Sequence, residues 1–229
     1  MGEMLTFPCP DGRAGQGYLA RTGGAPAAGV VVIQEWWGLQ GQIRSVCDRL
    51  AAAGFHALAP DLYGGKVVPY HDSGGAKAAM AALDFKAAAD GVVRGAVQHL
   101  RAAGARVGLA GFCMGGAVTI VGAVRIPELD AAVCFYGLPP EDVAAPKDLR
   151  VPLQCHFAAV DTWCTPEKVD AFEQQLRVAG KTFELFRYPG RHAFMNSDRH
   201  EVYDPAAAQL AWDRFLAFLE RHLTSSEPA

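Results

Sequence analysis

The chain has 229 residues, of which 51% are hydrophobic and 20% are charged, and its formal net charge is −3. A chain of this length suits one α/β domain with a large buried core, so we expect a single domain over residues 1–229. Because there is no basic excess to hold phosphate groups, we expect no nucleic-acid partner.

Apolar runs and helical patterns alternate along the chain. The first part, residues 6–20, is typical of a hairpin at the edge of a sheet. Short apolar runs predict strands at 29–34, 55–59, 106–110, 131–136, 152–158 and 183–188. Helical patterns predict helices at 40–53, 117–124, 166–179 and 205–222, and a further helix that ends near residue 103. The alternation predicts an α/β fold with a mostly parallel central sheet of about six strands, flanked by helices on both faces.

The region after the second of these strands has no periodic pattern. Residues 61–75 contain several glycines, prolines and tyrosines, and we expect them to form a loop over the carboxyl ends of the strands. The alanine-rich stretch 76–89 that follows favours a helix. Loops at this end of a parallel sheet commonly shape a pocket.

The sequence contains no pattern for membrane insertion or metal binding. No apolar run reaches the roughly 20 residues of a membrane-spanning helix, and no signal-peptide pattern opens the chain, so we expect a cytoplasmic protein that does not bind membranes. The six cysteines include no CxxC pair, and the seven histidines include neither an HExxH motif nor a Cys/His cluster at ligand spacing. We therefore expect reduced thiols and no metal site.

A cysteine flanked by glycines, Cys113, lies between the predicted strand 106–110 and the predicted helix 117–124. The sequence reads GFCMGG from residue 111 to residue 116. This is the G-x-C-x-G pattern of a nucleophile elbow, in which glycines let the strand and helix backbones approach so that the central side chain projects from the sheet. The helix N-terminus also favours a thiolate. The alternative interpretation is a buried cysteine in a tight turn.

Two later loops supply an acid and a base. Asp161 follows the predicted strand 152–158, and His192 follows the predicted strand 183–188. In the α/β-hydrolase fold the nucleophile is followed along the chain by the acid and then by the histidine. We therefore predict Cys113 as nucleophile, His192 as base and Asp161 as the residue that orients the base. Taken singly, Asp161 fits a surface helix cap, and His192 fits an exposed loop.

Glu35 is unusual because it follows a continuous apolar run at 30–33 and precedes two tryptophans. A carboxylate in such a place must be paired or neutralised. One interpretation is a structural partner for an arginine or for backbone amides. The functional interpretation puts Glu35 beside Cys113, with the backbone N–H groups of Trp36 and Met114 facing the developing oxyanion.

These residues together resemble the dienelactone hydrolase (carboxymethylenebutenolidase) family of the α/β-hydrolase superfamily. The similarity runs from about residue 5 to about residue 222 and rests on the stretches 34–35, 59–63, 111–116 and 190–194 and on Asp161. The resemblance implies an α/β-hydrolase fold and a Cys113–His192–Asp161 triad. It also implies that Glu35 helps to draw the proton from the thiol when substrate arrives. The implied reaction is the opening of an unsaturated lactone through a thioester, without a cofactor.

The sequence departs from that family where the substrate carboxylate binds. Well-known members use one arginine in the lid region and one shortly after the catalytic histidine, whereas here Asn196 lies four residues past His192 and residues 61–75 offer only Lys66. Lys66, Arg191 or Arg199 could replace those arginines. The other predicted substrate-binding residues are Trp37, Tyr63, Tyr136 and Phe194. Of these, Trp37, Tyr63 and Tyr136 could equally be core or surface aromatics.

The resemblance leaves several functions open. The first is hydrolysis of a small lactone or ester, with a dienelactone-type enol lactone as the favoured substrate. A general carboxylesterase or thioesterase would use the same residues. A silent binding protein is less favoured because no triad member is missing. A cysteine peptidase is the least favoured because an elbow with this strand order belongs more often to small-molecule hydrolases. The protein is expected to be a monomer or a small homo-oligomer.

Overall fold

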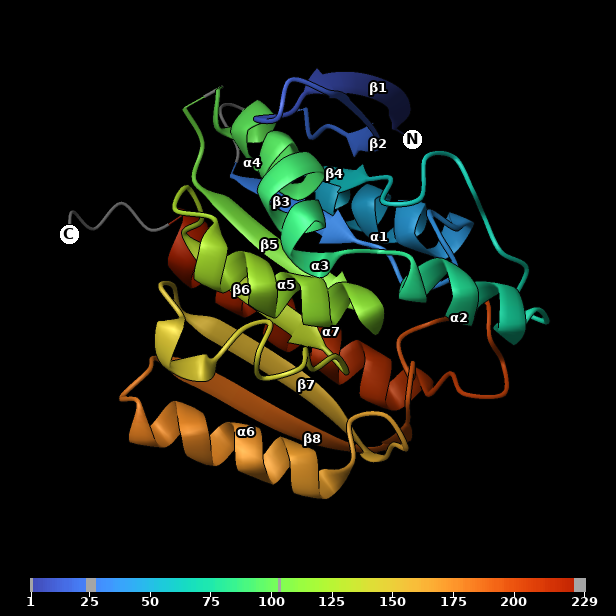
Figure 1. The fold of residues 1–229 in the computed structure, drawn as a ribbon, viewed down its shortest axis with the longest axis vertical. Helices are drawn as coiled ribbons and strands as arrows, with labels where there is room; N and C mark the ends of the chain where they lie inside the picture. Colours follow the sequence, from blue (N-terminus) through green and yellow to red (C-terminus); the bar gives the residue numbers. More distant parts are fainter. Residues whose placement is uncertain (1, 24–27, 103, 225–229) are drawn as a thin grey trace.

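An eight-stranded sheet forms the centre of the computed structural model, which describes residues 2–23, 28–102 and 104–224 (Figure 1). In chain order the strands are β1 (Glu3–Pro8), β2 (Ala14–Ala20), β3 (Gly29–Ile33), β4 (His56–Pro60), β5 (Val107–Phe112), β6 (Ala131–Phe135), β7 (Leu153–Val160) and β8 (Phe183–Arg191). Across the sheet their order is β1, β2, β4, β3, β5, β6, β7, β8.

The direction of the strands divides the sheet into two parts. Strands β3 to β8 pair in parallel, whereas β2 pairs antiparallel with both β1 and β4. The parallel part and the antiparallel hairpin at its edge confirm the predicted fold class. All six parallel strands therefore end at the same side of the sheet, and the loops that follow them meet there.

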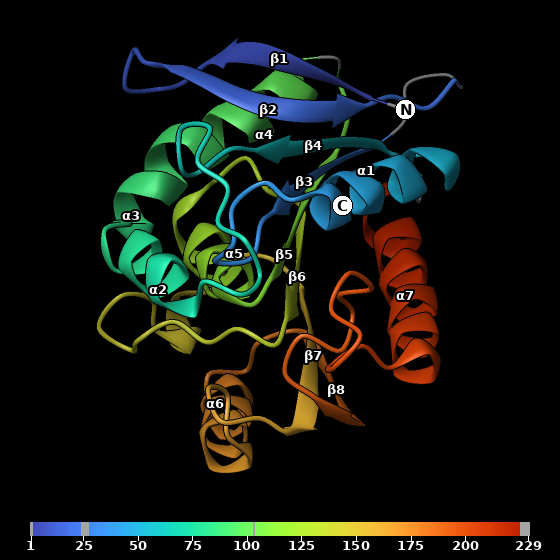
Figure 2. The same cartoon turned by 90° about the vertical axis from the view of Figure 1, so that its right-hand side faces the viewer.

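Helices cover both faces of the sheet, as predicted. They are α1 (Gly41–Ala52), α2 (Ser73–Ala81), α3 (Phe85–Ala88), the π-helical η1 (Ala89–Val93), α4 (Arg94–Arg101), α5 (Met114–Arg125), the 3-10 turn η2 (Pro146–Asp148), α6 (Pro166–Val178), α7 (Pro205–Leu219) and the π-helical η3 (Glu220–Thr224). Figure 2 shows α1 and α7 on one face and α4, α5 and α6 on the other. In the described part of the chain, no helix combines the length and the apolar character needed to cross a membrane.

Alternate residues of the central strands point to opposite faces of the sheet. In β3, Val30 and Val32 belong to the core beneath α1 and α7, whereas Val31 and Ile33 belong to the core beneath α4. All four are fully buried, and burial of each such side chain stabilises the fold by roughly 1.5–3 kcal/mol. Because the central strands are buried on both faces, their carboxyl ends form a rigid base for the site.

The segment between β4 and α4 differs from the sequence prediction. The loop ends at Asp72, whose carboxylate accepts the N–H of Gly75 and caps α2, so the predicted loop is wrong for its last three residues. The alanine-rich stretch is not one helix either, because α2 stops at Ala81 and the carboxylate of Asp84 starts α3. Val68 donates its N–H to the carbonyl of Trp37 at 2.8 Å, which joins the loop to the residues after β3.

Candidate active site

Cys113 occupies a sharp turn between β5 and α5, with φ 55° and ψ −119°. A positive φ is unusual for a residue with a side chain and is tolerated where the surroundings impose it. Glycines are required around it, because a Cβ on Gly111 would lie 2.1 Å from the carbonyl oxygen of Gly115. A Cβ on Gly115 would lie 2.5 Å from the carbonyl oxygen of Gln34. The geometry is that of a strand–elbow–helix turn, with a partly exposed thiol at its tip.

Strained backbone conformations occur at the carboxyl ends of three parallel strands. Among the described residues, the non-glycine residues with positive φ are Cys113, Tyr136 at 40° and Ala193 at 67°. They follow β5, β6 and β8 respectively, and the rings of Tyr136 and His192 lie 5.2 Å apart, edge to face. Such strain is characteristic of functional sites, where it fixes side chains in one orientation.

Asp161 and His192 form a short hydrogen bond. The Nδ1 atom of His192 lies 2.7 Å from Oδ2 of Asp161, and Oδ1 of Asp161 accepts the backbone N–H groups of Trp163 and Cys164. Burial acts to raise the pKa of Asp161, but the hydrogen bond and charge of His192, helped by the two amides, outweigh it and hold that pKa below its usual range. Because the carboxylate is ionised, Nδ1 is the donor and Nε2 is the basic nitrogen in the neutral ring.

The free nitrogen of His192 faces the cysteine. Within the described structure Nε2 is buried and makes no well-formed hydrogen bond, yet the Cys113 sulfur is near enough to act strongly on the ring. Burial acts to lower the pKa of His192, but the negative charge of Cys113 and the hydrogen bond to Asp161 outweigh it and raise that pKa to about 10. The imidazole therefore interacts with the carboxylate of Asp161 through Nδ1 and with the sulfur of Cys113 on its other side.

Glu35 is buried, with 2% of its surface exposed. Its Oε1 accepts a hydrogen bond from the hydroxyl of Tyr136 at 3.3 Å, and its Oε2 accepts one from Nδ2 of Asn196 at 2.8 Å. Burial raises the pKa of Glu35, although Asn196, His192 and Arg199 act in the opposite direction. Among the described residues, the carboxyl accepts hydrogen bonds from the neutral side chains of Tyr136 and Asn196. The role of Glu35 in drawing the thiol proton stays a prediction.

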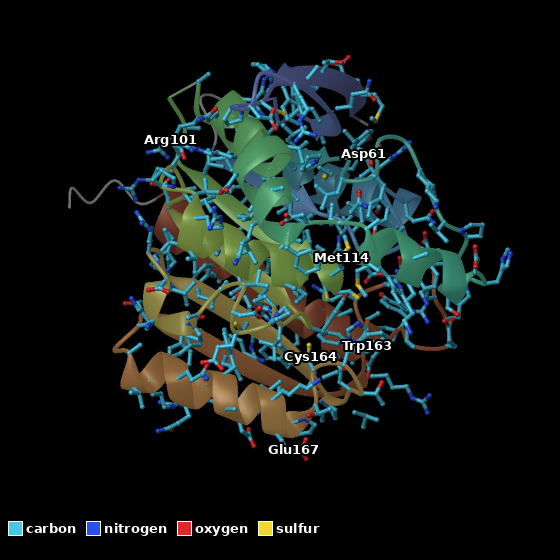
Figure 3. The ribbon with its side chains drawn as sticks, viewed as in Figure 1. Asp61, Arg101, Met114, Trp163, Cys164 and Glu167 are labelled. Atoms are coloured by element: carbon cyan, nitrogen blue, oxygen red, sulfur yellow. The ribbon has the colours of Figure 1, made fainter. Side chains whose placement is uncertain are left out.

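One cavity of about 180 Å³ brings the predicted chemical groups together. It is lined by Glu35, Trp36, Trp37, Met80, Cys113, Thr162, Trp163, His192, Ala193, Arg199 and Val202. Figure 3 shows Met114 and Trp163 at the same end of the sheet, where the strands β5 and β7 terminate. Glu35, Cys113 and His192 are therefore open to the same small molecule.

Not every predicted binding residue reaches this cavity. Lys66 and Arg191 are exposed and lie outside its lining. Tyr136 and Phe194 are fully buried beneath it, where their rings pack together at 5.4 Å. Tyr63 lies beside the elbow and donates its hydroxyl to Sδ of Met114 at 3.1 Å.

The sequence offered Lys66, Arg191 and Arg199 as cations for a substrate carboxylate. Of these three, Arg199 lines the cavity. Its guanidinium lies 5.5 Å from the ring centre of Trp37 and pairs with Glu201 at 2.7 Å. The side chain of Glu201 is 63% exposed, so an anion inside the cavity can compete for the same guanidinium. The lining residues missed by the sequence prediction are Met80, Thr162, Trp163, Ala193 and Val202.

Aromatic rings form part of the cavity wall. Trp36 contacts Trp163 at 5.4 Å and Trp37 at 5.1 Å, and Trp37 contacts Tyr70 at 5.4 Å, all edge to face. Such a wall favours planar, conjugated or apolar molecules. Across the described ranges of the chain, no three His, Cys, Asp or Glu side chains gather to hold a metal ion, and the six cysteines are unpaired with one another.

Comparison with known proteins agrees with this geometry. The model of the dienelactone hydrolase family matches residues 16–223. Protein usf of Aquifex pyrophilus is 35% identical over 98% of this chain and 100% of its own length. An Aquifex aeolicus protein with the provisional name carboxymethylenebutenolidase is 31% identical over 97% of this chain and 100% of its own length.

A solved structure agrees as well. The crystal structure of a Klebsiella pneumoniae protein, provisionally described as a dienelactone hydrolase, superposes with a TM-score of 0.82 at 30% identity and covers 96% of this chain and 99% of that chain. These matches agree with the observed fold. They also agree with the order along the chain of Cys113, Asp161 and His192, which follow β5, β7 and β8. The chain therefore belongs to the dienelactone hydrolase family, whose members are hydrolases of the α/β-hydrolase fold that act on ester or lactone bonds.

Proposed function

We propose that this hydrolase opens a small ester or lactone through a thioester on Cys113, with His192 as base and Asp161 as the residue that orients it. The observation that carries the proposal is the 2.7 Å bond from Asp161 to Nδ1 of His192, which leaves Nε2 unpartnered beside a cysteine on a strained elbow. This is the arrangement in which a base activates a nucleophile while a third group fixes its tautomer.

Acylation begins when the sulfur of Cys113, with its proton transferred to Nε2 of His192, attacks the carbonyl carbon. The carbonyl π electrons move to oxygen, where the backbone N–H groups of Trp36 and Met114 stabilise the negative charge. Met114 is the first residue of α5, so its N–H has no acceptor one turn earlier in the helix. As the tetrahedral intermediate collapses, the C–O bond breaks and the leaving oxygen takes the proton from His192.

Deacylation uses the same groups in reverse. His192 removes a proton from water, the hydroxide attacks the thioester carbonyl, and the C–S bond breaks. The thiolate of Cys113 recovers the proton, so the enzyme returns to its starting state and the products are the acid and the alcohol. For a lactone, both groups belong to one product molecule.

The cavity favours a small substrate that carries a carboxylate on a planar scaffold. Its volume of about 180 Å³ lies below the roughly 300–1,000 Å³ of pockets for larger ligands. Arg199 supplies a positive charge, and Trp36 and Trp37 supply flat apolar walls. The name of the Aquifex aeolicus relative describes such a molecule, a butenolide lactone with a carboxymethylene group.

Trapping the acyl-enzyme tests the proposal directly. With p-nitrophenyl acetate and a rapid acid quench, we expect one acetyl group on the peptide that contains Cys113, removable by neutral hydroxylamine as a thioester is. The buried thiols Cys47 and Cys164 should stay unmodified, because burial raises the pKa of both. Turnover without acetyl on Cys113, measured by peptide mass mapping, would contradict the proposal.

Arg199→Gln should weaken the binding of acidic substrates selectively. A charge-assisted hydrogen bond is worth roughly 1.5–3 kcal/mol, so we expect KM for a carboxylate-bearing butenolide to rise by about tenfold to a hundredfold. The neutral primary amide of the same butenolide should change little. Arg191→Gln is the matched control, since Arg191 is exposed and outside the cavity lining. Equal losses for acid and amide would argue against a carboxylate contact.

A further inference from the structure

A second hollow adjoins the catalytic cavity at Trp163. It has a volume of about 360 Å³ and lies between α6 and residues 138–146. Trp163 lines both this hollow and the cavity that contains Cys113 and His192. The two spaces therefore share one lining residue, Trp163. We call the second space the α6 groove.

The walls of the α6 groove are mostly apolar. Residues 138–140 contribute a leucine and two prolines, and Phe172 and Ala171 contribute the floor from α6. At the far end Gln175 donates its side-chain amide to the carboxylate of Glu141 at 3.3 Å, which joins α6 to the loop across the groove. Between Lys168 and Gln175 the helix rises about 10 Å, so the groove has room for a chain of several carbons or for a ring.

Trp163 is 51% exposed, although it is a large hydrophobic residue. Its ring contacts Trp36 at 5.4 Å, and its backbone N–H donates to Asp161 at 2.7 Å. A half-exposed tryptophan held between two hollows is well placed to bury its surface against a ligand that spans them. Asp161 also pairs with Nδ1 of His192, so a single carboxylate contacts both Trp163 and the base.

We infer that the α6 groove receives the apolar alcohol portion of an acyclic ester, so that the protein hydrolyses such esters as well as compact lactones. The inference rests on the proposed function. During acylation the leaving oxygen must come to Nε2 of His192 to take its proton, so the alcohol is the part of the substrate that points toward the base. The α6 groove adjoins the cavity that contains His192 at Trp163, which lines both spaces, so we assign the alcohol portion to this groove.

The sizes of the two hollows agree with this assignment. The catalytic cavity alone, at about 180 Å³, holds only a compact group, whereas with the α6 groove the space enters the range of roughly 300–1,000 Å³ for larger ligands. An acyl group in the inner cavity and an alcohol in the groove would use both. Each methylene that is buried against the apolar walls of the groove should raise kcat/KM by about fourfold.

Two ester series test the inference. One series keeps the acetyl group and lengthens the alcohol from methanol through butanol and hexanol to octanol. The other keeps methanol and lengthens the acid by the same steps. We expect kcat/KM of the wild type to rise along the alcohol series and to stay level or fall along the acid series, where the small cavity limits the chain. A level alcohol series, or a rise confined to the acid series, would overturn the inference.

Ala171 offers a variant with a matched control. Ala171→Phe should fill the groove and lower kcat/KM for octyl acetate by at least about tenfold, while methyl acetate stays within about twofold, because Ala171 is an exposed helix position. Gln174→Phe places the same ring at an exposed position of α6 outside the lining of the groove and should behave as the wild type. Equal losses for octyl and methyl acetate in Ala171→Phe would overturn the inference.

Binding of octan-1-ol separates this inference from the proposed function. We expect octan-1-ol to shift the NMR signal of the Trp163 indole in the wild type and in Gln174→Phe, but not in Ala171→Phe. If the wild type hydrolysed no ester, the proposed function would fail, and this titration would still decide whether the groove binds an apolar alcohol. Absence of the shift in the wild type would overturn the inference by itself.

Discussion

Cys113→Ala is expected to lower kcat/KM for ester hydrolysis by at least about 10⁴-fold, because residues of a triad act as a unit and the remaining groups cannot form a thioester. The elbow would still present its backbone N–H groups, so substrate binding should persist and KM should change less than kcat. The measurement is steady-state hydrolysis of an activated ester, with lactone hydrolysis as a second substrate.

A matched control is available in the same chain. Cys9→Ala makes the same chemical change at a thiol in the region of the β1–β2 hairpin, and its kcat/KM should stay within about threefold of the wild type. Far-ultraviolet circular dichroism would establish that both variants are folded. If Cys113→Ala kept activity within tenfold of Cys9→Ala, another nucleophile would have to be sought.

Asp161→Asn is the second change with a large expected effect. The carboxylate accepts a hydrogen bond from Nδ1 of His192 at 2.7 Å. An amide in its place would stabilise that tautomer, and the positively charged ring, less well than the carboxylate does. In the well-studied serine protease triad the corresponding change lowers kcat by about 10⁴-fold, and we expect a loss of this order here. Asp170→Asn on the exposed surface of α6 is the control, and it should leave kcat unchanged.

The same variant should change the titration of His192. Because Asp161 helps to raise the pKa of His192 to about 10, that pKa should fall in Asp161→Asn, as followed by NMR of the imidazole. The raised pKa stabilises the fold fully below the unfolded value near 6.5, and this stability is lost as pH rises through about 10. Asp161→Asn should therefore lower the free energy of unfolding more at neutral pH than above pH 10. An unchanged His192 titration would contradict the assigned partnership.

The parallel sheet could be predicted from sequence because its central strands are buried on both faces. Strands β3 and β6 are continuous apolar runs bounded by turn residues, a pattern with few alternatives. The ends of the strands were harder to predict. Strand β8 continues through Pro189 and Gly190, which usually interrupt a strand, and its extension depends on pairing with β7 rather than on local preference.

Helix α2 shows why the region before η1 could not be predicted. It begins with Ser73, Gly74 and Gly75, which are poor helix formers, so local preference indicates a loop. The helix forms because Asp72 caps it and because Ala76 is buried against Trp37. Both effects need the loop to be folded back on the residues after β3, which no single stretch of sequence reveals.

The chemical centre of the site could be predicted because each residue has a local signature. Cys113 lies in a glycine pattern whose geometry is fixed by close backbone contacts, and Asp161 and His192 follow strands in a required order. The walls of the cavity could not be predicted in the same way. Met80 and Val202 come from α2 and from the turn before α7, and their position depends on how these segments pack.

The distribution of tryptophan in the molecule has a practical consequence. Three of the four tryptophans, Trp36, Trp37 and Trp163, line the catalytic cavity, whereas Trp212 packs against Phe215 on α7. Most of the intrinsic fluorescence of the protein is therefore expected to arise from the walls of the cavity that contains Cys113. Binding and release of a ligand in the cavity can therefore be followed by intrinsic tryptophan fluorescence in real time, without a dye or a chromogenic substrate.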